Sequence, residues 1–137
     1  MDTLETVSAG KGEPVPQQLR VLFNRPDDVK VQKLPCALPD EDSLAEHFAA
    51  GSRTVPHTHH NGQHLVIMDS VGVVADDTGV HVVRAWDLLS SPPGGWHWHG
   101  AAPDSATTHV TVEQPGDFDL AVERRDRDTA YAPEHGT

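Results

Sequence analysis

Short apolar segments, each followed by glycine, proline or aspartate, succeed one another from Gly51 to about residue 113. Asp76–Gly79 (DDTG) has the composition of a hairpin turn, and Pro92–Gly95 (PPGG) is a still stronger turn signal. Many short strands at regular spacing, separated by turn residues, are typical of an antiparallel sandwich or barrel. The sequence therefore predicts an all-β fold. The segments expected to be strands are 64–70, 71–75, 80–86, 96–100 and 106–112, and 88–91 leads into the Pro92–Gly95 turn.

The first 50 residues are less regular. Gln18–Asn24 (QLRVLFN) alternates apolar and polar residues and is predicted to be a strand, and Val29–Leu34 is a shorter candidate. Leu44–Ala50 contains helix-forming residues but is short for a helix, so its conformation stays ambiguous. A length of 137 residues suits one domain. We expect a loose arm over 1–16, a barrel over 17–122 and a charged tail over 123–137.

The charge of the chain limits its partners. A formal net charge of −11 argues against nucleic acid and anionic membranes, because both bind through basic patches. The single cysteine, Cys36, allows no internal disulfide and is compatible with a reducing compartment. The first ten residues contain no apolar signal segment, and no apolar run is long enough to span a bilayer. We therefore expect a soluble, cytoplasmic protein without nucleic-acid or membrane partners.

Histidine is the unusual component of this composition: the chain has ten, and eight of them lie within 57–109. His57 and His59 are two residues apart, so on a strand both imidazoles project from one face. Taken alone, such a pair fits a surface strand about as well as a metal site. Gln63 follows four residues after His59, and His97 stands directly behind a second turn. Imidazole binds zinc, manganese, iron, nickel and copper alike, so the group points to a metal site without naming the metal.

The residues around these histidines resemble the two motifs of the cupin family, G-x5-H-x-H-x3,4-E-x6-G and G-x5-P-x-G-x2-H-x3-N. The resemblance implies a cupin barrel, which is a double-stranded β-helix or jelly roll of antiparallel strands. It also implies one divalent transition metal ion, for which manganese, iron, zinc and nickel are the candidates. Gly51, His57 and His59 match the first motif, and Pro92, Gly94 and His97 match the second. The implied metal ligands are His57, His59, Gln63 and His97.

The fourth ligand is a choice between Gln63 and His64. The family's glutamate stands six or seven residues after the first histidine, so both positions qualify, and imidazole is chemically the stronger ligand. The stretch is similar to a subgroup of small bacterial cupins that reads W-H-T-H-P-L-G-Q-T-L, with which Gly62, Gln63 and Leu65 align. This register favours Gln63 as the ligand and makes His64 an outward-facing strand residue.

The second motif resembles the same subgroup, which reads P-P-G-E-K-H-W-H-G-A where this chain has Pro92–Ala101. The subgroup includes manganese-dependent hydroxynitrile lyases and cupins associated with carboxymuconolactone decarboxylases. The resemblance implies that His109 is a catalytic acid or base near the metal. On the strand 106–113 either His109, Thr111 and Glu113 face inward, or the intervening valines do, and the pattern leaves both open. Further residues expected at the pocket are His64, His99, Trp96 and Leu65.

The chain departs from the family pattern at three positions. Ser70 and Trp86 stand where the motifs have glycine. A positive φ is unfavourable for residues other than glycine, so we expect these two turns to differ or to be strained. Trp96 replaces a lysine beside His97, which removes a positive charge and adds a large ring. The substrate is therefore expected to differ from that of the characterised lyases.

Three functions follow from these residues. Neutral ligands leave a bound divalent ion its full charge, which favours Lewis-acid chemistry on a small carbonyl or hydroxy compound by a lyase, isomerase or cyclase. With ferrous iron, the same site would activate dioxygen, as in non-haem dioxygenases. The third possibility is a non-catalytic cupin that binds a small molecule. The resemblance also implies a homodimer, with Gln18–Asn24 as a candidate for an exchanged strand.

Overall fold

Antiparallel strands make up most of the structure, a computed structural model that describes residues 4, 6–8, 10–36, 40–114 and 118–122. Every strand pairing in these ranges is antiparallel, which confirms the predicted all-β fold. The helical elements are the 3-10 helices η1 (Gln17–Leu22) and η2 (Pro26–Asp28). The strands are β1 (Glu13–Pro14), β2 (Val29–Leu34), β3 (Asp42–Phe48), β4 (Gln63–Asp76), β5 (Gly79–Arg84), β6 (Leu88–Ser91), β7 (Trp98–Ala101) and β8 (Thr107–Glu113).

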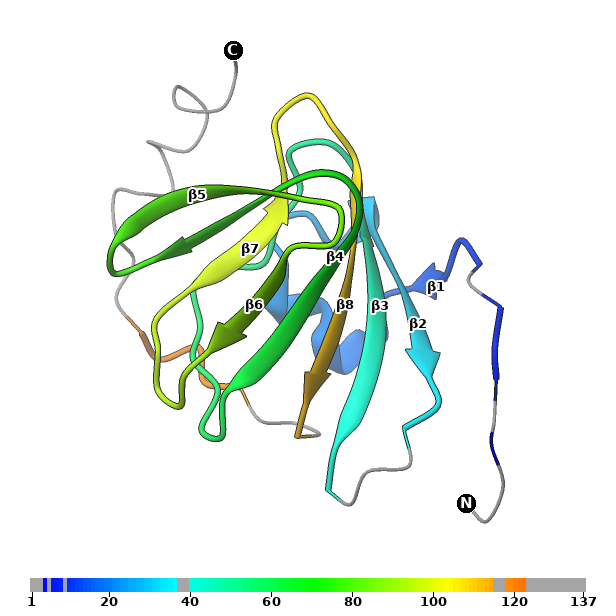
Figure 1. Cartoon of the computed structure of the whole chain (residues 1–137), viewed down its shortest axis with the longest axis horizontal. Helices are drawn as coiled ribbons and strands as arrows, with labels where there is room; N and C mark the ends of the chain where they lie inside the picture. Colours follow the sequence, from blue (N-terminus) through cyan, green and yellow to red (C-terminus); the bar gives the residue numbers. More distant parts are fainter. Residues whose placement is uncertain (1–3, 5, 9, 37–39, 115–117, 123–137) are drawn as a thin grey trace.

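Strand β4 is the longest element, with 14 residues, and it belongs to both halves of the barrel. Its first half pairs with β6 and β8, and its second half pairs with β5 and β7. Beyond β8 the sheet continues through β3 and β2 to the short β1. Figure 1 shows β4 crossing the molecule, with β5 and β7 to one side and β8, β3 and β2 to the other. The space between these two groups of strands is where inward-facing side chains meet.

A β-bulge bends β4 from one group of strands into the other. The register against β8 shifts between Ile67 and Asp69, so Met68 is the extra residue. Ser70, two residues on, has a φ of 56°. One extra residue exchanges the two faces of a strand. Ile67 therefore faces the interior before the bulge, and Gly72 faces it beyond the bulge, where its Cα lies against an interior histidine.

Buried apolar side chains form three clusters. One joins the N-terminal segment to β2 and β3, a second joins the end of β4 to β7, and a third consists of Leu65, Ile67 and Val83. The interior also holds many polar residues, which is costly unless the groups have partners or a chemical role. These buried polar residues include Glu46, His57, His59, Gln63, His97, His99, His109 and Thr111.

The segment Gln18–Asn24 is not a strand, and this prediction was wrong. Most of it forms η1, in which Leu19 and Leu22 are three residues apart and therefore lie on one side of a 3-10 helix. Leu22 and the following Phe23 are buried in the protein's own core. Apolar and polar residues do alternate along this segment, but packing of Leu19 and Leu22 against the core favours a 3-10 helix. An exchange of this segment as a strand between two subunits has no support in this conformation.

The other strand predictions differ from the structure mainly at their ends. Leu44–Ala50, which the sequence left ambiguous, lies largely in strand β3, and the two strands expected over 64–70 and 71–75 are the single strand β4. The sheet begins within the expected arm, because Glu13 pairs with Val31. The expected tail, 123–137, lies outside the described residues. No helix among the described residues has the length and apolar character needed to cross a membrane.

Candidate metal centre

The two histidine motifs meet through a pair of backbone hydrogen bonds. The amide of His57 donates to the carbonyl of His97 (2.9 Å), and the amide of His97 donates to the carbonyl of His57 (3.1 Å). Residues paired in this way carry their side chains on the same side of the ladder. The imidazoles of His57 and His97 therefore lie next to one another, with ring centroids 4.4 Å apart and ring planes tilted by 57°.

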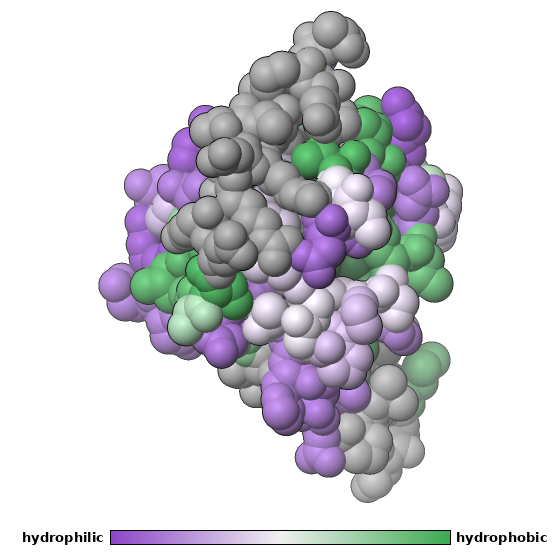
Figure 2. All heavy atoms as spheres, turned by 90° about the vertical axis from the view of Figure 1, so that its left-hand side faces the viewer, coloured by the Kyte–Doolittle hydropathy of each residue, from purple (hydrophilic) through white to green (hydrophobic). Residues whose placement is uncertain are grey.

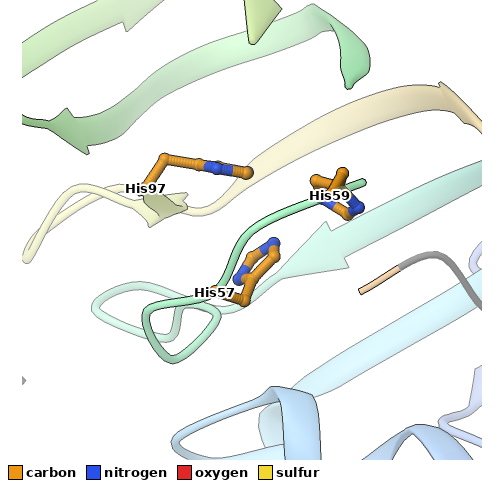
Figure 3. A group of neighbouring side chains, drawn as sticks. All are labelled: His57, His59 and His97. Atoms are coloured by element: carbon orange, nitrogen blue, oxygen red, sulfur yellow. The ribbon is translucent and has the colours of Figure 1, made fainter. Parts of the chain in front are cut away.

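His59 completes a group of three, which we call the histidine cluster (His57, His59 and His97). Its backbone carbonyl accepts hydrogen bonds from the amides of Gly62 and Gly94, so one residue anchors the turns of both motifs. Both glycines have a positive φ, which explains why glycine stands there. The three residues can each offer one ring nitrogen such that these nitrogens lie within 4.8 Å of one another. Figure 3 shows the three side chains, which come from two separate segments, gathered around a common point.

Hydrogen bonds at Nδ1 orient the three rings. His57 Nδ1 is 2.7 Å from the carbonyl oxygen of Val55, and His97 Nδ1 is 3.0 Å from that of Gly95. A neutral imidazole that donates from Nδ1 has its lone pair on Nε2, which is therefore the atom directed to a metal. His59 Nδ1 lies 2.9 Å from Oε2 of Glu113, an arrangement of carboxylate and histidine that recurs around protein-bound metals.

Gln63 and His64 point in opposite directions from the start of β4. Gln63 is buried, and its Oε1 lies 3.2 Å from Nε2 of His97, so the amide oxygen is directed toward the cluster. Its Nε2 donates to Oε1 of Glu113 (3.2 Å), which identifies the amide orientation. His64 is exposed. The register expected for this strand thus places Gln63, and not the chemically stronger neighbour, beside the three imidazoles.

Burial keeps these imidazoles in the form that binds metals. Desolvation lowers the pKa of His57 well below its usual 6.5, and proximity to His97 lowers it further. Desolvation likewise lowers the pKa of His97 to about 4. Metals bind the neutral imidazole, and bound protons compete with them. Three imidazole nitrogens and one amide oxygen, from side chains each held by a further hydrogen bond, therefore fit a divalent transition metal ion.

A cavity of about 150 Å³ opens beside the cluster, and we call it the main cavity. Of the residues expected at the pocket, Leu65, Trp96 and His99 line it, together with Gln63 and His97. His64 is not among its lining residues. The remaining lining residues are mostly small or apolar but include two carboxyl groups. They are Val74, Asp76, Asp77, Leu89, Ser90, Ser91, Pro92 and Gly95.

His109 lies behind His99, one side chain further from the main cavity. On β8, His109 and Thr111 are buried while Val110 and Val112 are only partly so, which answers the question of which face is turned inward. Nδ1 of His109 is 3.1 Å from Nδ1 of His99, so one of these nitrogens donates a proton to the other. Desolvation lowers the pKa of His109 to about 3, and it lowers that of His99 well below 6.5. The two residues are therefore a neutral, hydrogen-bonded pair.

Ser70 and Trp86 both adopt a left-handed backbone conformation, which favours glycine. Their φ values are 56° and 75°. The expectation of strain at these two positions is therefore met, at about 1–2 kcal/mol per residue. Trp86 leaves its ring exposed, so burial of the side chain does not offset this strain.

Two acidic residues near the site were not predicted from the sequence. Glu113 contacts both His59 and Gln63, and Glu46 is buried on β3 directly across from His109. Glu113 was visible only as one of two possible inward faces of its strand. Glu46 gave no signal, because the conformation of its segment was ambiguous.

Solved structures with a similar fold are cupins. A cupin-like protein from Thermotoga maritima matches with a TM-score of 0.75 and 22% identity, over 90% of this chain and 95% of that chain. A cupin-2 domain protein from Rhodospirillum rubrum matches with a TM-score of 0.62 and 20% identity, over 75% of this chain and 70% of that one. A polyketide cyclase from Streptomyces resistomycificus matches with a TM-score of 0.60 and 15% identity, over 80% and 82%. This chain is therefore a small protein with the cupin fold and a buried cluster of three histidines that could hold a metal ion.

Among characterised proteins, the chain is similar to an (R)-mandelonitrile lyase from Granulicella tundricola. The two are 38% identical over 68 residues, which are 49% of this chain and 52% of the relative. The chain thus matches about half the length of that enzyme. No protein-family profile matches the chain.

Proposed function

We propose that this protein is a metal-dependent lyase that acts on a small hydroxy or carbonyl compound. The observation that carries the proposal is the convergence of three imidazoles and the Gln63 amide beside a largely apolar cavity. A divalent ion held by four neutral ligands supplies, when bound, a strong Lewis acid that polarises a substrate oxygen. The similarity to a mandelonitrile lyase favours bond cleavage next to such an oxygen over the other chemistries of a cupin site.

The protein's own acid–base group in this proposal is His99, which is hydrogen-bonded to His109. His99 lines the main cavity and is neutral, so it can accept a proton from a substrate hydroxyl at Nε2. Its Nδ1 shares a hydrogen bond with Nδ1 of His109 (3.1 Å), which holds the His99 ring in place. In this proposal His109 is a positioning residue, and His99 is the group that meets the substrate.

The main cavity limits the substrate by size and polarity. A cavity of about 150 Å³ is large enough for a benzene-sized molecule. The Trp96 ring and the side chains of Leu65 and Leu89 provide apolar walls. The size of the cavity and its apolar walls favour a compact aromatic or branched hydroxy compound, and Asp76 and Asp77 in the lining disfavour a negatively charged one.

The test combines metal analysis with a cleavage assay. Elemental analysis of protein purified without chelators should find stoichiometric manganese or zinc in the natural protein and little in His97→Ala. The metal-loaded protein should then release aldehyde from cyanohydrins such as mandelonitrile, and His99→Ala should lose most of that rate while it keeps the metal. Absence of stoichiometric metal would support a non-catalytic binding protein instead. Iron together with iron-dependent oxygen uptake would support a dioxygenase.

A further inference from the structure

A second cavity lies on the far side of Glu113 from the histidine cluster, and we call it the acidic cavity. Its volume is about 80 Å³, and helix η1 and strands β3 and β8 contribute its walls. Glu113 is shared, because it lines this cavity and also contacts His59 and Gln63. The lining residues that decide its chemistry are Leu22, Phe23, Phe118, Asp42, Glu46 and Glu113.

Glu46 is the residue in this cavity that lacks a partner. Its side chain lines the cavity, the residue is 4% exposed, and its Oε1 makes no hydrogen bond. Buried polar atoms almost always have a partner, because an unmade hydrogen bond costs the full desolvation of the group. Among the described residues no group is hydrogen-bonded to this oxygen, so a hydrogen-bond donor that enters the cavity beside Glu46 can satisfy it.

The charge around Glu46 favours a cation in this space. Among the described residues, the lining contains three carboxyl groups and no lysine or arginine. Burial, and after it the nearby charge of Glu113, raises the pKa of Glu46 to about 8. A cation between these groups would offset both effects, whereas an anion would add to them. Phe23 and Phe118 contribute aromatic side chains to the same lining.

An organic cation fits this cavity better than a metal ion. Among the described residues, the one group of three or more potential ligands that converges closely enough for a metal is the histidine cluster. The carboxyl groups here are therefore too widely spaced to enclose a compact ion, and much of the wall is apolar. The volume is about half that of the main cavity, which limits the occupant to a few carbon atoms.

We propose that the acidic cavity binds a small primary amine in its ammonium form, with the nitrogen donating to the carboxylate of Glu46 and the carbon chain against Leu22 and Phe118. The proton of Glu46 passes to solvent as the ammonium ion enters, so the bound pair is neutral. Glu46 thereby gains the partner that it lacks.

The experiment is a titration of the full-length, metal-loaded protein with n-propylamine, followed by 1H–15N NMR. Saturable shifts are expected at the amides of Leu22, Leu44 and Glu46. Two analogues of nearly the same size complete the series: 1-propanol should bind at least about tenfold more weakly, and propionate should not bind. Equal affinity for the amine and the alcohol, or no saturable shift with the amine, would overturn the proposal and leave only water in the cavity.

Variants test whether Glu46 is the group responsible. Glu46→Gln keeps the shape but cannot pair with an ammonium ion, so n-propylamine affinity should fall at least about tenfold. Glu13→Gln makes the same chemical change at an exposed position and should bind the amine normally. Unchanged affinity in Glu46→Gln would contradict the assignment. If that variant fails to fold, the comparison of amine, alcohol and carboxylate on the natural protein still decides. None of these measurements depends on catalysis at the histidine cluster.

Discussion

At the scale of single residues, Glu113 accounts for the orientation of two candidate ligands. One of its oxygens contacts His59 Nδ1 (2.9 Å), and the other accepts from the Gln63 amide (3.2 Å). Removal of such a partner lowers metal affinity by roughly 10–100-fold, because the ligands lose their fixed orientation and basicity. We expect a loss of that size for Glu113→Ala in a competition titration against a chromogenic chelator. Glu13→Ala, which removes an exposed carboxylate, should keep the natural affinity.

The buried carboxyl of Glu46 should make stability depend on pH. Its pKa rises from an ordinary 4.5 to about 8 in the folded protein, first through burial and then through Glu113. The folded state therefore holds an additional proton between these values. The corresponding stability is fully present below about pH 4.5 and is lost as the pH rises through about 8. Glu46→Gln carries no such proton. The free energy of unfolding, measured in urea, should therefore rise in Glu46→Gln relative to the natural protein. The expected relative rise between mildly acidic and mildly alkaline pH is on the order of a few kcal/mol. Parallel pH profiles would contradict this.

Trp86 offers a separate measurement of backbone strain. Its φ of 75° is unfavourable for any side chain, and its ring is exposed. Trp86→Gly and Trp86→Ala remove the same ring, but only glycine relieves the strain. We expect the free energy of unfolding of the glycine variant to be about 1 kcal/mol higher than that of the alanine variant. The relief of about 1–2 kcal/mol of strain is partly offset by the greater entropy of glycine in the unfolded chain. Equal thermal stability of the two variants would show that this turn is not strained.

The sequence predicted the histidines of this site better than its acids. His57, His59 and His97 stand beside glycine and proline turns whose spacing can be read along the chain. The contacts of Glu113 and Glu46 depend on strand register, because they are made with residues of neighbouring strands. A period of two residues leaves the inward face undecided until the neighbouring strands are known.

At the scale of elements, the bulge in β4 makes room for His109. It turns Gly72 inward, where a Cβ would lie 2.7 Å from His109 Nε2 and 3.1 Å from the Gly100 carbonyl oxygen. Gly72→Ala should therefore destabilise the protein by about 1–3 kcal/mol in urea unfolding, since the backbone oxygen cannot move away. His109 should also shift, which would be visible in its ring NMR signals. Gly10→Ala, with no atom nearer than 3.9 Å, is the matched control and should change stability by less than about 0.5 kcal/mol.

The type of an element was predictable where a strong turn signal flanked it. The prediction failed where packing against the core determined the local conformation. The hairpin at Asp76–Gly79 is present as expected, since its turn chemistry is local. The segment Gln18–Asn24 was mistaken for a strand, because a short 3-10 helix against the core shows a similar mixture of apolar and polar residues. The continuity of β4 through Ser70 could not be foreseen, since a bulge leaves no mark in the hydrophobic pattern.

At the scale of the whole molecule, the exposed apolar surface bears on whether two subunits associate. Figure 2 shows the side on which β5 and β7 lie, where hydrophobic patches are separated by hydrophilic surface. Four large apolar residues on β4, β5, β6 and the connection between β5 and β6 are at least one-third exposed, namely Met68, Val82, Trp86 and Leu88. A homodimer stays a prediction. If the subunits associate, these residues offer apolar area that does not require the strand exchange first expected.

A metal ion at the histidine cluster would join parts of the chain that are far apart in sequence. His57 and His59 lie between β3 and β4, Gln63 begins β4, and His97 precedes β7. A ligand that binds only the folded state stabilises it by about 4 kcal/mol at a concentration a thousand times its Kd. Chelation of the metal should therefore lower the Tm of the natural protein by about 10 °C or more in differential scanning calorimetry. His97→Ala should already unfold at the lower temperature and should not respond to the chelator. An equal response of both proteins would mean that the stabilising metal binds elsewhere.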